Sequence, residues 1–165
     1  MTLWSWALSV AALVLAAGGV LKVVEPAASR PMMEAFELPS GPVAMRCWGA
    51  LELAISVTVL AGGPWLATAA LGCSYTVFTL MVALLRRRSP TTSCGCIGRW
   101  SAPPTRRHIM INAAGALVGA AALVTRSSAV PPTDQLGGTV TYWVMAVVAA
   151  AAILVTLSGT TVRRR

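Results

Sequence analysis

Two cysteines separated by a single glycine, Cys94-Gly95-Cys96, are the residues of this sequence best suited to chemistry. Two thiols at this spacing can close into a disulfide, bind one soft metal ion, or remain unreactive. A disulfide across one residue forms a small ring that strains the preferred torsion angle, and strain makes the bond easier to reduce. Gly95 relieves part of that strain because glycine reaches backbone angles closed to other residues. The spacing suits a redox-active dithiol, and it equally suits a soft-metal site.

Arginines flank this loop on both sides, at 86–88 and at Arg99. Nearby positive charge favours the thiolate, which is the form that attacks disulfides and binds metals. Two further cysteines, Cys47 and Cys73, lie in apolar segments. Cys47 is a candidate for resolving a mixed disulfide with the loop, although small apolar cysteines more commonly serve packing. Packing is the stronger expectation for Cys73.

The composition predicts an integral membrane protein. Of the 165 residues, 56% are hydrophobic and 11% are charged, whereas soluble domains carry about 25% charged residues. The net charge of +8 is compatible with nucleic-acid binding, but the basic residues lie at the ends of apolar runs. Arginines there mark the cytoplasmic ends of membrane spans and contact anionic lipid. We therefore expect a lipid bilayer environment and no nucleic-acid partner.

Five apolar segments are long enough to cross the hydrocarbon core, which takes about 20 helical residues. They are expected near residues 3–21, 43–60, 65–85, 107–124 and 140–157. No lysine or arginine precedes the first segment, so the positively charged start of a signal peptide is missing. We therefore predict an uncleaved membrane helix. A proline-containing connection follows it, with a weak pattern for a short helix lying on the membrane surface. The predicted fold is an all-α integral membrane protein with five transmembrane helices.

The distribution of charge predicts an orientation. Five spans place the two termini on opposite sides, and the side opposite the cysteine loop carries Arg126 alone. By the positive-inside rule, the N-terminus lies outside, and the Cys-Gly-Cys loop and the C-terminus lie in the cytoplasm of a multi-pass cell-membrane protein. Cytosolic thiols are mostly kept reduced, so a disulfide in this loop would be transient and catalytic rather than structural.

The parity of the spans places several polar residues in the same leaflet as the cysteine loop, whichever way the chain is oriented. Glu52 falls about two helical turns inside the hydrocarbon, where a carboxylate usually faces the bundle interior with a partner. Lys22, at the same level of the neighbouring helix, is the predicted partner. The pair suits proton exchange for thiol chemistry or a contact with the loop, and it equally suits a packing role. His108, one turn before Asn112, is expected at the lipid–water boundary.

The order of these features resembles the MauE family of methylamine-utilisation proteins, within the wider DoxX-like membrane group. The resemblance covers roughly residues 5–125 and rests on Gly19 to Lys22, Leu51 to Leu53, the Cys-Gly-Cys-Ile-Gly sequence at 94–98, Arg106 or Arg107, and Asn112. The usual family sequence has phenylalanine in place of Ile97. The resemblance implies a four-helix membrane core and a role in maturing methylamine dehydrogenase, whose small subunit is rich in disulfides. It also implies a thioredoxin-like partner.

These observations lead to one functional hypothesis and two alternatives. A MauE/DoxX-like unit is predicted at residues 1–125, with the cysteine loop at 92–100, followed by a fifth helix and basic tail at 126–165. The hypothesis is a membrane thiol–disulfide oxidoreductase that acts with a thioredoxin-fold protein, with Cys94 and Cys96 as the redox pair and Glu52 and Lys22 supporting them. A quinone is one candidate for the electron acceptor. The alternatives are a soft-metal carrier and a structural subunit with unreactive cysteines.

Overall fold

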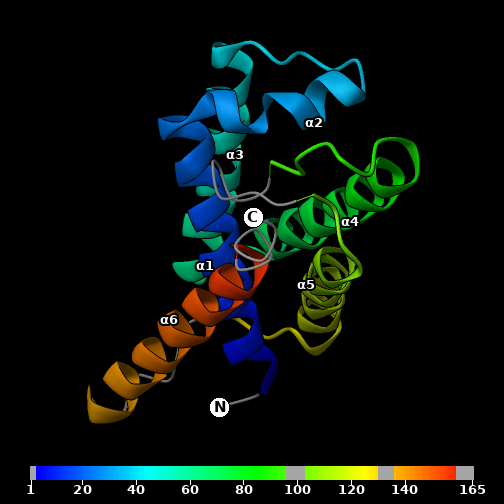
Figure 1. The fold of residues 1–165 in the computed structure, drawn as a ribbon. Coiled ribbons are helices and arrows are strands. Elements are labelled where there is room, and N and C mark those ends of the chain that lie inside the picture. The colour runs from blue at the N-terminus through cyan, green and yellow to red at the C-terminus, as the bar shows by residue number, and fades with distance from the viewer. Residues whose placement is uncertain (1–2, 96–102, 130–135, 159–165) are drawn as a thin grey trace.

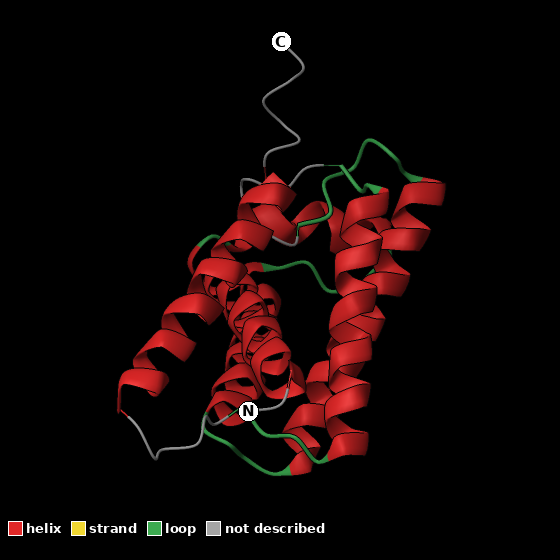
Figure 2. Ribbon diagram, turned by 90° about the horizontal axis from the view of Figure 1, so that it is seen from below, coloured by secondary structure: helices red, strands yellow, loops and turns green. Residues whose placement is uncertain are grey.

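The computed structural model describes residues 3–95, 103–129 and 136–158, and every regular element in these residues is a helix (Figures 1 and 2). The elements are α1 (Leu3–Val24), the 3-10 turn η1 (Pro26–Ser29), α2 (Arg30–Ala35), α3 (Pro42–Leu60), α4 (Trp65–Arg88), α5 (Arg106–Thr125) and α6 (Leu136–Ser158). Helices α1, α3, α4, α5 and α6 are long and apolar enough to cross a membrane. The predicted all-α fold with five membrane-spanning helices is confirmed.

Local sequence sets the ends of these helices. Pro42 occupies the first turn of α3, where the missing backbone N–H costs no hydrogen bond. Gly62 follows α3 with a φ of 70°, a left-handed conformation that glycine adopts readily, and the chain turns directly into α4. Helix α5 begins with a capping box between Thr105 and His108. The connection between α3 and α4 is consequently short and covers only residues 61–64.

Glycines allow the helices to approach closely in two pairs, α1 with α3 and α4 with α5. A β-carbon placed on Gly19 would lie 2.8 Å from the carbonyl oxygen of Gly49, and one placed on Gly49 would lie 2.6 Å from the carbonyl oxygen of Gly19. In the second pair, a β-carbon on Gly119 would lie 2.7 Å from the α-carbon of Gly72. Because real β-carbons do not approach so closely, the two pairs depend on the absence of a side chain at these positions.

Helix α6 packs along α1 (Figure 1). Val10 of α1 forms a buried apolar cluster with Ala146 and Ala150 of α6. The Tyr142 hydroxyl lies 2.6 Å from Ser9 Oγ and donates to the backbone carbonyl of Ala129 at 3.1 Å. These polar contacts hold the connection before α6 and the helix itself against α1.

The proline-containing connection after α1 forms η1 and α2, so the short helix is present as predicted. Its two methionines face the protein: Met32 and Met33 are both almost fully buried. Met32 packs with Val82 and Leu85 near the end of α4. The η1–α2 segment therefore joins the ends of α1 and α3 to the end of α4, where the cysteine loop begins.

Candidate functional site

The side chain of Cys94 is buried in the protein, although the residue belongs to a loop. Its side chain is 0% exposed and belongs to the apolar cluster of Met32, Val82 and Leu85. Cys96, the second cysteine of the predicted redox pair, lies outside the described residues, as does Arg99. Burial of this kind restricts access to the sulfur of Cys94, because attack on a sulfur requires that a reagent can reach it.

Gly95 docks the cysteine loop on the η1 turn. The hydroxyl of Ser29, itself buried, donates a hydrogen bond to the Gly95 carbonyl at 2.8 Å. Gly95 has a φ of +64°, and a β-carbon there would lie 2.8 Å from the α-carbon of Ser29. Two physical requirements thus select glycine at this position: a left-handed backbone and close contact with a neighbouring main chain. The sequence predicts the first requirement, whereas nothing in it indicates Ser29 as the partner.

The predicted ion pair between Lys22 and Glu52 is present. Lys22 Nζ lies 2.9 Å from Glu52 Oε2, and both side chains are 3% exposed. Helices α1 and α3 run in opposite directions (Figure 1), and side chains on a helix lean toward its N-terminus. Lys22 therefore leans into the bundle and Glu52 leans back toward the helix end, so that the charged groups meet. Lys22 Nζ also lies 5.4 Å from the centre of the Phe78 ring, a cation–π contact.

The ion pair depends on the close contact between α1 and α3. Gly19 lies three residues before Lys22, and Gly49 lies three residues before Glu52. A β-carbon on Gly49 would lie 2.9 Å from Lys22 Cβ, and one on Gly19 would lie 3.2 Å from Glu52 Cβ. The glycines thus leave the space in which the two charged side chains reach each other. The contact places one charge from each helix in the bundle interior, as intramembrane charges require.

His108 differs from the prediction of a position at the lipid–water boundary: its side chain is only 1% exposed. The physical reason is helix capping. The backbone N–H of Thr105 donates to His108 Nδ1 at 3.3 Å, and Thr105 Oγ1 lies 2.7 Å from the same nitrogen. A neutral imidazole has one acceptor nitrogen and one N–H. Because Nδ1 accepts the backbone hydrogen bond, we assign the N–H to Nε2.

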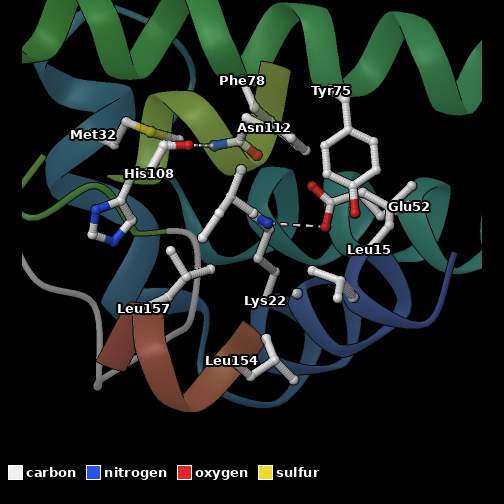
Figure 3. A pocket seen from close by; sticks show the side chains of 13 residues that line it. Leu15, Lys22, Met32, Glu52, Tyr75, Phe78, His108, Asn112, Leu154 and Leu157 are labelled. Carbon is white, nitrogen blue, oxygen red and sulfur yellow. Dashed lines mark hydrogen bonds and ion pairs between the residues drawn. The ribbon is translucent and has the colours of Figure 1, made fainter. Parts of the chain in front are cut away.

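A cavity of about 40 Å³ lies between these groups (Figure 3). All five membrane-spanning helices and α2 contribute to it. The lining consists of Val14, Leu15, Gly18, Lys22, Met32, Glu52, Tyr75, Phe78, His108, Ile111, Asn112, Leu154 and Leu157. Met32 both lines this cavity and packs against Cys94, so one side chain separates the cavity from the cysteine loop. Three of the lining residues could not be predicted from the sequence: Tyr75, Leu154 and Leu157.

Asn112 supports the cavity through the backbone of α5. Its amide nitrogen donates to the His108 carbonyl at 2.9 Å, and the two side chains line the same cavity, as their spacing of one helical turn predicts. The hydroxyl of Tyr75 donates to the Ala11 carbonyl at 2.7 Å. The bond from Asn112 lies within α5, whereas the bond from Tyr75 ties α4 to α1.

Cys47 and Cys73 do not belong to the buried cluster around Cys94. Both are exposed on the protein, so neither is packed in its core. Cys73 lines a groove of about 160 Å³ between α3 and α4, which Glu52 also lines. Within the described residues, no group of three or more histidine, cysteine, aspartate or glutamate side chains is placed to hold a metal ion.

The helices and this site define a multi-pass α-helical membrane protein in which a buried ion pair lies beside a docked cysteine loop. A family model described as methylamine utilisation protein MauE matches residues 1–126, and the chain belongs to this family. Membership supports a membrane role in methylamine utilisation. Neither the search of curated proteins nor the search of solved structures found a match.

Proposed function

We propose that the protein exchanges disulfides in the membrane, with Cys94 and Cys96 as its dithiol and a thioredoxin-fold protein as its partner. Its role in methylamine utilisation would be the maturation of disulfide-containing proteins such as the small subunit of methylamine dehydrogenase. The observation that carries the proposal is the docking of the Cys94-Gly95 backbone on Ser29. This contact and the bond from Ser29 give the backbone beside the first thiol a defined position against the η1 turn.

The proposed exchange passes electrons and protons between two dithiols, one in this protein and one in its partner. A thiolate of the partner attacks one sulfur of the Cys94–Cys96 disulfide, and the other sulfur leaves as a thiolate and takes up a proton. The second thiolate of the partner then attacks the mixed disulfide, which releases the reduced pair and oxidises the partner. Two electrons and two protons pass between the pairs, and the reverse sequence runs by the same steps. Because Cys94 is buried, we assign the mixed disulfide to Cys96.

Lys22 and Glu52 are proposed as positioning residues for this chemistry. Their ion pair joins α1 to α3, and the η1 turn that receives the cysteine loop directly follows α1. Fixing the two helices fixes the turn and, through Ser29, the Cys94-Gly95 backbone. The pair also keeps a proton-binding carboxylate within the cavity that Met32 separates from the loop.

Trapping of the mixed disulfide tests this proposal. A single-cysteine thioredoxin-fold partner, activated as a mixed disulfide with a small aromatic thiol, is mixed with the reduced membrane protein, and the covalent complex is followed on a non-reducing gel. The Cys94→Ser variant is expected to form the complex and to retain it, because the thiol that resolves the mixed disulfide in the wild type is absent. The Cys96→Ser variant should react at least about tenfold more slowly than Cys94→Ser, which corresponds to about 1.4 kcal/mol in the barrier, because the remaining thiol of the pair, Cys94, is buried.

The exposed cysteines supply the control for this experiment. Cys47→Ser and Cys73→Ser are expected to leave complex formation unchanged. If the Cys94→Ser/Cys96→Ser double variant still forms the complex at the wild-type rate, the reactive thiol lies elsewhere and the proposal is wrong.

For the orientation, we propose that the N-terminus lies outside and the cysteine loop in the cytoplasm. The support is the arginine excess at the loop end of the helices, including 86–88, against Arg126 alone at the other end. Two exposed positions report on the two ends: Thr91→Cys and Ser128→Cys, each in a chain whose own cysteines are serine. A membrane-impermeant maleimide added to intact cells is expected to label only Ser128→Cys. Labelling of Thr91→Cys alone would reverse the orientation.

A further inference from the structure

Two side chains that line the cavity, Glu52 and His108, each carry a buried polar atom whose hydrogen-bonding capacity is not met among the described residues. Glu52 Oε2 binds Lys22, but the second carboxylate oxygen, Oε1, makes no hydrogen bond, and the indole Nε1 of the neighbouring Trp48 is likewise without one in this part of the chain. The same is true of His108 Nε2 within this part of the chain. Both side chains line the cavity, and both are more than nine-tenths buried. Leaving buried polar atoms of this kind without a hydrogen bond destabilises a protein.

The chemistry of the two atoms specifies what would satisfy them. Glu52 Oε1 is an acceptor, and His108 Nε2 carries a hydrogen because Nδ1 accepts the backbone bond from Thr105. A molecule that both donates and accepts hydrogen bonds is therefore required. The volume sets its size: each buried water takes about 10–15 Å³ of such space, so a cavity of about 40 Å³ has room for about three waters. A molecule as large as a nucleotide or a sugar does not fit.

We propose that this cavity is a water-binding site, occupied by about three water molecules that satisfy Glu52 Oε1 and His108 Nε2–H. The titratable groups that line it come from four helices: Lys22, Glu52, Tyr75 and His108. Lys22 is paired with Glu52, and the hydroxyl of Tyr75 donates to a backbone carbonyl. Helix α6 closes the site with two leucines, Leu154 and Leu157 (Figure 3).

Water in this cavity would take part in proton transfer inside the membrane. It gives the Glu52 carboxylate a partner for proton transfer other than Lys22, on the side of the protein where the cysteine loop is docked. Its use as a proton reservoir for the dithiol rests on the proposed function, since each exchange step binds or releases a proton at sulfur. The water site itself does not depend on that function.

Radiolytic labelling detects such water directly, because X-rays turn bound water into hydroxyl radicals that oxidise the side chains next to it. The chain offers a matched pair of tyrosines: Tyr75, which lines the cavity and is 4% exposed, and Tyr142 of α6, which packs against α1 and is 3% exposed. The full-length protein in detergent is irradiated in H₂¹⁸O, and uptake of ¹⁸O is measured by mass spectrometry. Tyr75 is expected to label several-fold faster than Tyr142 despite equal burial.

A cavity-filling variant tests whether the water that labels Tyr75 lies in this cavity. Leu154→Phe adds volume at the α6 side of the cavity and is expected to lower Tyr75 labelling to the level of Tyr142. Equal labelling of the two tyrosines in the wild type would overturn the proposal. Fast Tyr75 labelling that Leu154→Phe does not lower would overturn the assignment to this cavity. The same results are expected in the Cys94→Ser/Cys96→Ser variant, so loss of thiol exchange and loss of the water site are separate outcomes.

Discussion

Replacing Lys22 by methionine is expected to destabilise the protein by about 3–5 kcal/mol, because it leaves the Glu52 carboxylate buried without its counter-ion. Both partners are 3% exposed and lie 2.9 Å apart, so bulk solvent does not reach the charge that remains. The free energy of unfolding, measured in detergent by the denaturant midpoint and slope, gives the effect. Removing both charges in Lys22→Met/Glu52→Leu is expected to restore most of the lost stability, since no unpaired charge is then buried.

The chain contains a matched control for this ion pair. Arg30 and Glu34 form a second pair at 3.2 Å, but their side chains are 48% and 53% exposed. Exposed pairs one helical turn apart contribute about 0.3–0.5 kcal/mol, so Arg30→Met should change the free energy of unfolding by no more than this. If Lys22→Met were as mild as Arg30→Met, the Glu52 carboxylate would not be held as a buried charge, and its role as the organising polar group of the bundle would be wrong.

Replacing Gly95 by alanine is expected to release the cysteine loop from the η1 turn. The left-handed backbone at Gly95 costs another residue about 1–2 kcal/mol, and the added methyl group would lie 2.8 Å from the α-carbon of Ser29. Two main chains would have to separate, and the bond from Ser29 Oγ to the Gly95 carbonyl would be lost. The expected result is a marked rise in the rate at which Cys94 reacts with a maleimide.

This measurement is made in a chain with serine at positions 47, 73 and 96, so that the label reports Cys94 alone. Gly41→Ala is the control, because Gly41 has ordinary backbone angles and a β-carbon there meets no atom within 4 Å. It should leave the reactivity of Cys94 unchanged. A Gly95→Ala variant in which Cys94 stays as unreactive as in the parent would show that the Ser29 contact does not control access to the thiol.

The class of protein, the number of spans and the central ion pair could all be predicted from the sequence alone. Apolar runs of about 20 residues have few stable alternatives to a membrane-spanning helix, so composition and length sufficed for α1, α3, α4, α5 and α6. The partner of Glu52 could be predicted from the depth of each charge along its own helix. A charge in the hydrocarbon needs a counter-charge at the same depth, and Lys22 is at the same level of the neighbouring helix.

The side chains around that pair, and the contacts at Cys94 and Gly95, depend on how the helices pack and could not be predicted from the sequence. The contacts of Ser29 with Gly95 and of Met32 with Cys94 join segments more than 60 residues apart, and no periodicity encodes such a pairing. His108 shows the same limit, because its burial follows from the capping bond with Thr105 and from the neighbours of α5, not from its place at a helix start. Spacing along one helix is set by the backbone, whereas contacts between helices depend on how closely glycines such as Gly19 and Gly49 let them approach.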